Sequence, residues 1–101
     1  MALTLLAKTV AVAGTRDRLS ASSVPVAQAF IQAKSGNTGK IYIGDNTVAS
    51  TVCAELGIPQ SGMLLPALRV APSRATSVNL TDIYIDSQVS GEGVNVWYEP
   101  A

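Results

Sequence analysis

Two short runs of alternating apolar residues near the C-terminal end constrain the fold more than any other part of this sequence. Within Leu80–Glu99, the runs Ile83-Tyr84-Ile85 and Val94-Asn95-Val96-Trp97-Tyr98 are separated by Ser-Gly-Glu-Gly. Alternation places successive side chains on opposite faces of a strand, and a glycine-rich link reverses the chain. The stretch therefore predicts a β-hairpin.

The same pattern occurs a second time, earlier in the chain. Val24–Lys34 predicts a strand that begins beside a proline, a residue tolerated at strand starts. Residues 35–39, Ser-Gly-Asn-Thr-Gly, follow as a turn, and Lys40–Asp45 then repeats the Ile-Tyr-Ile core of the later stretch. We therefore expect a second hairpin over Val24–Asp45.

Two further segments complete the chain. Residues 1–13 predict an extended N-terminal strand or arm that is covered on both sides or lies against a neighbouring subunit. A short helix is the alternative there, because Ala, Leu and Lys favour helices. Residues 46–76 predict a long excursion, broken by Gly and Pro, with one short strand near Met63–Val70. We expect its apolar run, Met63–Leu68, in the core rather than at a subunit interface.

Short strands with turn signals between them, and no long helical pattern, predict an all-β fold. We expect a single β domain over residues 1–101. Its architecture is predicted to be a small antiparallel β-sandwich or barrel, jelly-roll-like, with one long irregular excursion. A chain of this length can bury a core without metals or disulfides.

Few charges are available to cover the surface of such a domain. Charged residues make up 14% of the sequence, against about 25% in an average soluble protein. This favours a homo-oligomer or assembly in which partners cover part of the surface; a compact monomer coated with small polar residues is the alternative. Seven basic and seven acidic residues leave no positive field for phosphates, so nucleic acid is not an expected partner.

The apolar start of the chain does not predict a membrane span. Lys8 interrupts it, and no apolar run approaches the roughly 18 residues that a membrane helix needs. We therefore expect a soluble protein that is made in the cytoplasm and has no membrane partner.

Catalytic chemistry has little support in the sequence. There is no histidine, the commonest general base and zinc ligand. Without one to activate it, Cys53 is expected to be a small, partly buried hydrophobe. Asp45, Asp82, Asp86 and Glu92 could hold calcium, but their spacing matches no calcium loop, and solvated turns are the favoured interpretation. We expect no enzyme, no cofactor and no metal site.

Three aromatic side chains alternate with the isoleucines and valines of the predicted strands. Tyr42, Tyr84 and Trp97 point away from the core if the Ile and Val faces form it. Exposed aromatic residues are typical of contact surfaces. The alternative is that a second sheet covers this face and each tyrosine hydroxyl reaches water at the rim.

Four motifs occur together in this chain: Gly36-Asn37-Thr38-Gly39, Ile41-Tyr42-Ile43-Gly44-Asp45, Ile83-Tyr84-Ile85-Asp86 and Gly91-Glu92-Gly93. With their flanking residues they cover about half of the chain, and they resemble a widespread kind of small structural protein, or module, of tailed-bacteriophage particles. The middle of the chain, residues 49–73, is longer and richer in proline than in that family. The resemblance implies a virion component without catalytic residues: a capsid decoration (cement) protein, a head fibre or a tail part.

Among these roles we favour capsid decoration, because the sequence has no coiled-coil stalk and no fibre repeat. Such a protein would be made in the host cytoplasm, reside in the virion as a homo-oligomer, with a trimer favoured, and bind the major capsid protein. The alternatives are a tail or neck component, or a receptor- or carbohydrate-binding β-sandwich with Tyr42, Tyr84 and Trp97 as a sugar platform. The expected interface residues are Leu3, Leu5, Leu6, Tyr42, Met63, Leu64, Leu65, Tyr84 and Trp97.

Overall fold

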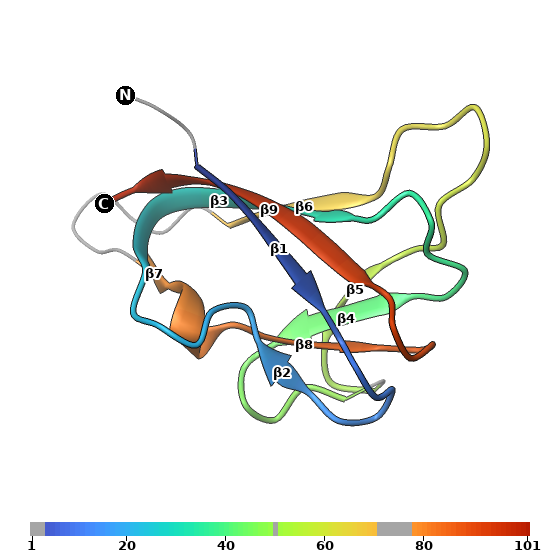
Figure 1. Cartoon of the computed structure of the whole chain (residues 1–101), viewed down its shortest axis with the longest axis horizontal. Coiled ribbons are helices and arrows are strands. Elements are labelled where there is room, and N and C mark those ends of the chain that lie inside the picture. The colour runs from blue at the N-terminus through green and yellow to red at the C-terminus, as the bar shows by residue number, and fades with distance from the viewer. Residues whose placement is uncertain (1–3, 50, 71–77) are drawn as a thin grey trace.

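Two antiparallel β-sheets pack face to face in the computed structural model, which describes residues 4–49, 51–70 and 78–101 (Figure 1). A 3-10 turn, η1 (Leu80–Asp82), precedes β8. The predicted all-β sandwich is confirmed, and over these ranges the sheets do not close into a barrel. The five-stranded sheet has the order β1 (Thr4–Thr9), β9 (Gly93–Pro100), β3 (Pro25–Ala33) and β6 (Ala67–Val70), with β7 (Val78–Asn79) paired to β3. The four-stranded sheet has the order β2 (Asp17–Arg18), β8 (Tyr84–Ser87), β4 (Ile41–Gly44) and β5 (Ala54–Leu56).

The strand order is that of one long antiparallel ribbon rolled around the core. β4 pairs with β5, β3 with β6, β2 with β8 and β1 with β9, and every pair is antiparallel. Rolling the ribbon brings β9 against β3 and β8 against β4, and these further pairings join it into two sheets. With the two-residue β7 set aside, this is the strand order of a jelly roll. The jelly-roll-like expectation is therefore confirmed.

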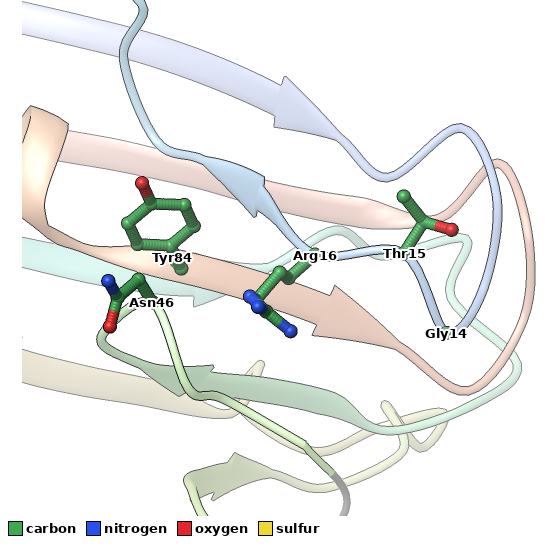
Figure 2. A pocket seen from close by; sticks show the side chains of 5 residues that line it. All are labelled: Gly14, Thr15, Arg16, Asn46 and Tyr84. Atoms are coloured by element: carbon green, nitrogen blue, oxygen red, sulfur yellow. The ribbon is translucent and has the colours of Figure 1, made fainter.

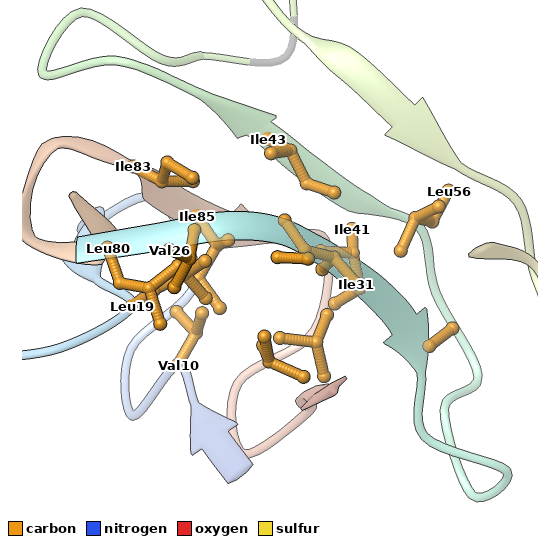
Figure 3. Packing of buried hydrophobic residues seen from close by; sticks show 14 residues of the cluster. Val10, Leu19, Val26, Ile31, Ile41, Ile43, Leu56, Leu80, Ile83 and Ile85 are labelled. Atoms are coloured by element: carbon orange, nitrogen blue, oxygen red, sulfur yellow. The ribbon is translucent and has the colours of Figure 1, made fainter. Parts of the chain in front are cut away.

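The core lies between the sheets and is built from the predicted isoleucine and valine faces (Figure 3). Strand alternation turns these side chains inward, and each one stabilises the fold by about 1.5–3 kcal/mol through burial of apolar area. The buried cluster consists of Val10, Leu19, Val26, Ala29, Ile31, Ala33, Ile41, Ile43, Leu56, Leu80, Ile83, Ile85, Val94 and Val96.

Both predicted hairpins are wrong, although their strands and turns are present. β8 and β9 lie in different sheets, as do β3 and β4. Residues 34–40 and 88–92 therefore each cross from one sheet to the other. A glycine-rich link signals that the chain turns, but it does not determine whether the two flanking strands pair with each other. The two crossing links lie at the same end of the sandwich (Figure 1).

The predicted 46–76 excursion is more regular than expected over its described residues. It contributes β5 and β6 rather than one strand, and the strand expected near Met63–Val70 is limited to Ala67–Val70. Only part of the apolar run reaches the core: Leu68 packs against it, whereas Met63 and Leu64 are 68% and 95% exposed. The physical reason is that the β5–β6 connection projects beyond the end of the sandwich (Figure 1).

The predicted N-terminal strand is confirmed as β1, and the alternative of a short helix is wrong. β1 is an edge strand whose two faces have different surroundings: Leu6 packs against the core, while Leu5 is exposed. Leu3 lies outside the described residues. Over the part of the chain that is described, no helix has the length and apolar character needed to cross a membrane.

Candidate functional site

The outer face of the four-stranded sheet carries an open groove. Tyr84 points outward because its neighbours Ile83 and Ile85 point into the core. In the sheet register Arg18 of β2 lies on one side of Tyr84 and Gly44 of β4 on the other. The Val48 side chain packs over Gly44, 3.2 Å from where a Cβ would lie, and a hollow remains open beside Tyr84. This hollow, of about 560 Å³, is lined by Gly14, Thr15, Arg16, Asn46 and Tyr84 (Figure 2).

Two loops form the walls of this groove, and internal hydrogen bonds hold both of them. On one side Gly14, with a φ of 87°, donates its backbone N–H to Asp86 Oδ1 at 2.9 Å. Asp86 is a buried anchor, only 6% exposed. On the other side Asp45 Oδ1 accepts the Thr47 N–H at 2.8 Å, and the Asp45 carbonyl accepts the Val48 N–H at 3.0 Å. The groove is therefore shaped before any ligand arrives.

Arg18 holds the Tyr84 ring in place. Its Nε donates to the Tyr84 hydroxyl at 2.8 Å, and its guanidinium carbon lies 5.6 Å from the ring centroid, a cation–π contact. A second hollow next to the first is lined by both residues together with Asp45, Asn46, Thr81 and Asp82. The 560 Å³ hollow is lined by Tyr84 but not by Arg18, so one side of the ring borders open space.

The two hollows together form the groove, and charges of both signs line it. Arg16 and Arg18 supply positive charge, and Asp45 and Asp82 supply negative charge. Hydrogen bonds from the Thr47 hydroxyl and backbone N–H lower the pKa of Asp45, and the nearby Arg16 lowers it further. Asp45 is therefore a carboxylate at neutral pH, and the groove carries balanced charge.

The outer face of the five-stranded sheet carries an apolar row instead. Leu5 of β1, Trp97 of β9 and Phe30 of β3 occupy paired register positions, so their side chains are neighbours across the sheet. They are 56%, 43% and 37% exposed. Exposed aromatic residues in a continuous patch are typical of protein–protein contact surfaces.

Polar side chains border this apolar row. Arg69 of β6 lies opposite Phe30 and donates from Nη2 to Gln28 Oε1 at 3.2 Å. Gln28 in turn donates from Nε2 to Glu99 Oε2 at 3.4 Å. An apolar centre with a hydrogen-bonded polar rim is the usual arrangement of a protein–protein interface.

The two crossing links clasp each other at the end of the sandwich. The Glu92 carboxylate accepts the Thr38 N–H at 2.6 Å, the Thr38 hydroxyl at 2.8 Å and the Gly39 N–H at 2.9 Å. Asn37 is buried; its Nδ2 donates to the Gly93 carbonyl at 2.8 Å, and its Oδ1 accepts the Gly93 N–H at 3.3 Å. Two of the motifs that carry the phage resemblance therefore have a structural role.

Acid should weaken this clasp. Burial alone would raise the pKa of Glu92, but the hydrogen bonds from Thr38 and Gly39 outweigh it and hold the pKa below its ordinary value of 4.5. The stabilisation is therefore complete above that value and is lost as the pH falls through the lower, folded-state pKa. We expect the urea midpoint of the unsubstituted protein to fall on acidification. The urea midpoint of Glu92→Gln should fall less steeply over the same pH range.

A graded variant checks the origin of this pH dependence. Thr38→Val removes one of the donors to Glu92 and should give a slope between those of Glu92→Gln and the unsubstituted protein. Identical pH profiles for Glu92→Gln and the unsubstituted protein would contradict the role given to this carboxylate.

The predicted interface residues lie on several surfaces. Leu5 and Trp97 belong to the apolar row, and Met63 and Leu64 are exposed on the projecting β5–β6 connection. Leu65 is half-buried, and Leu6 faces the core.

Of the two predicted tyrosines, Tyr84 lines the groove, whereas Tyr42 is only 9% exposed. Tyr42 and the buried Val48 line the same hollow, at the wall formed after β4. The folded-back 45–49 segment therefore leaves little of the Tyr42 ring available for contacts.

The predicted sugar platform of Tyr42, Tyr84 and Trp97 is not assembled. The tyrosines lie on the outer face of the four-stranded sheet, and Trp97 lies on that of the five-stranded sheet. These faces are opposite surfaces of the sandwich. The error follows from the wrong hairpin, which would have placed β8 and β9 in one sheet.

The acidic residues considered for calcium are separated by the fold. Asp86 supports the Gly14 wall and Glu92 the clasp, and only Asp45 and Asp82 share a hollow. Among the described residues, no three His, Cys, Asp or Glu side chains are close enough to hold a metal ion. Cys53 is half-buried as predicted, and burial raises the pKa of its thiol.

Sequence reasoning missed Arg16, Asn46 and Phe30. Arg16 lies in the stretch Thr15–Ser20, where charged and neutral residues alternate, a pattern that is typical of an exposed edge or loop and indicates no binding site. Phe30 becomes part of a surface through its pairing with Trp97, a residue far away in the chain, and no local signal reports this. No protein-family model, curated protein or solved structure matches this chain in the comparisons.

Proposed function

We propose that this chain is a structural protein of a tailed-bacteriophage particle, and specifically a capsid decoration protein that stabilises the head by bridging major capsid subunits. The observation that carries the proposal is the apolar row of Leu5, Trp97 and Phe30 on a rigid sheet face. Met63 and Leu64 are exposed as well, and they belong to the β5–β6 connection, which projects from the end of the same domain (Figure 1).

Two separate apolar surfaces suit a bridging role. Trp is among the residues that contribute most to binding at interfaces, and its ring here has Leu5 and Phe30 as direct neighbours. The projecting connection presents Leu64 almost fully to solvent, which favours coverage by another protein. One surface can bind one capsid subunit while the other binds the next.

Fold and composition give further support. Jelly rolls occur in viral capsid domains, although they also occur in lectins, so the fold is an analogy and not a function. The low charge content agrees with a surface that is partly covered in an assembly. We propose a homo-oligomer, because β1 is an edge strand and carries the exposed Leu5. A trimer is favoured, since decoration proteins commonly form trimers around local symmetry axes.

Heads assembled without this chain test the proposal. We expect them to release DNA at a lower temperature than complete heads, and purified chain to restore their stability when added. Trp97→Ser should restore it poorly, because it removes the centre of the apolar row. Val52→Ser is the matched control: Val52 is 58% exposed but lies outside that row, and its variant should restore stability fully.

Two results would contradict the decoration role. Heads that resist heat equally well without the chain would overturn it. Intact, stable heads on particles that no longer adsorb to cells would instead support the tail or receptor-binding alternative. The mass of the purified chain, measured by light scattering, distinguishes a trimer from a monomer.

A further inference from the structure

We propose that the groove beside Tyr84 is a binding site for a neutral carbohydrate. The site consists of Gly14, Arg16, Asn46 and Tyr84, with Asp45 and Asp82 at its far end. It lies on the sheet face opposite the apolar row, so it is independent of the decoration role.

The charge balance of the groove selects the class of ligand. An anion would meet the carboxylates of Asp45 and Asp82, and a cation would meet the guanidinium groups of Arg16 and Arg18. A ligand that is neutral but rich in hydroxyl groups avoids both repulsions. It can accept hydrogen bonds from the arginines and donate hydrogen bonds to the carboxylates.

The polar groups of the groove have capacity for such hydrogen bonds. Within the described residues, the Arg16 guanidinium and the Asn46 amide make no hydrogen bond to the protein, and neither does the Asp82 carboxylate. Toward the residues that the structure describes, Arg18 uses only its Nε, which leaves its terminal nitrogens for a ligand. A carbohydrate can therefore bind without breaking bonds that hold the fold.

Tyr84 supplies the apolar part of the site. The aliphatic face of a sugar ring packs against an aromatic ring, while its hydroxyls point to the sides. Arg18 fixes the ring through its hydrogen bond to the hydroxyl, and Tyr84 lines the hollow, so part of the ring is open to a ligand. The hollow of about 560 Å³ lies within the roughly 300–1,000 Å³ range of small-ligand sites.

The rigidity of the walls favours binding by this groove. The Gly14 wall is held by the buried Asp86, and the Asn46 wall is held by the Asp45 hydrogen bonds. A preformed site avoids the entropic cost of ordering loops around the ligand. The preformed walls therefore offset part of the low affinity that is usual for an open, hydrated site.

Titration of the ¹⁵N-labelled protein with neutral saccharides, chosen by screening a printed glycan array, tests the proposal. We expect backbone amide shifts at Gly14, Arg16, Asn46 and Tyr84. Tyr84→Ala should weaken binding about tenfold or more. Asn46→Ala and Arg16→Ala alter exposed side chains outside the core and should weaken it about threefold to tenfold.

Arg69→Ala is the matched control, because Arg69 is an exposed arginine on the opposite sheet face and should leave binding unchanged. Several outcomes would overturn the proposal: no neutral glycan binds, only sialylated or sulfated glycans bind, or the shifts centre on Trp97. Unchanged affinity in both Asn46→Ala and Arg16→Ala would overturn it as well. None of these results bears on the stability of phage heads.

Discussion

Replacing Gly93 with alanine should lower the free energy of unfolding by about 3 kcal/mol or more. Gly93 begins β9 at the point where β1 crosses closest to it. A Cβ there would collide with the Lys8 carbonyl oxygen and come within 2.8 Å of Thr9 Cα. These are backbone atoms, so β1 would have to move away from β9 to relieve the collision. The urea midpoint, measured by tryptophan fluorescence, gives the loss.

Gly36→Ala is the matched control for this substitution. Gly36 lies in the other crossing link, where an added Cβ meets nothing within 4 Å and the backbone φ is not positive. Its variant should be neutral or slightly more stable, because alanine reduces the entropy of the unfolded chain. Equal midpoints for Gly93→Ala and the unsubstituted protein would contradict the close approach of β1 and β9.

Removing the side chain of Asn37 should cost about 2–3 kcal/mol, the second largest effect we expect. Asn37 is 6% exposed and bonds both polar backbone groups of Gly93. Asn37→Ala leaves the Gly93 N–H without this acceptor in a buried position. The Gly93 carbonyl keeps its bond from the Lys34 N–H at 3.2 Å, which limits the loss. Urea unfolding measures the effect.

The exposed Asn46 provides the comparison for Asn37. Asn46→Ala removes an equivalent amide from the groove wall, where the amide bonds nothing in the described part of the chain. The free energy of unfolding should therefore change by no more than about 0.5 kcal/mol. Similar losses for the two variants would show that Asn37 contributes no more than a surface residue. The clasp would then not explain the glycine-rich motifs.

These motifs were predicted as hairpin turns, but their glycines and polar residues serve contacts between the links. Gly93 permits the close passage of β1, and Asn37 and Glu92 join residues 34–40 to residues 88–93. The motif residues are therefore explained by packing at one end of the sandwich. The phage family expected from these motifs therefore rests on residues that serve the fold of this chain, and the proposed function depends on the exposed surfaces.

The sequence alone determined which strand faces are buried and where the chain turns. The Ile and Val positions of the two Ile-Tyr-Ile runs and of the last strand are all in the core, as alternation predicted. This succeeds because alternation is a local property: the side-chain period of a strand is the same whichever strand pairs with it. The positions of the glycine-rich links are local in the same way.

Only the tertiary structure decided which strands pair and which surfaces result. β1 and β9 are separated by most of the sequence, yet they pair with each other, and that pairing brings Leu5 beside Trp97. The groove needs the 13–16 loop, β8 and the 45–49 loop together. The physical reason is that backbone hydrogen bonds between strands are almost independent of sequence, so partners are chosen by how the whole ribbon encloses its core.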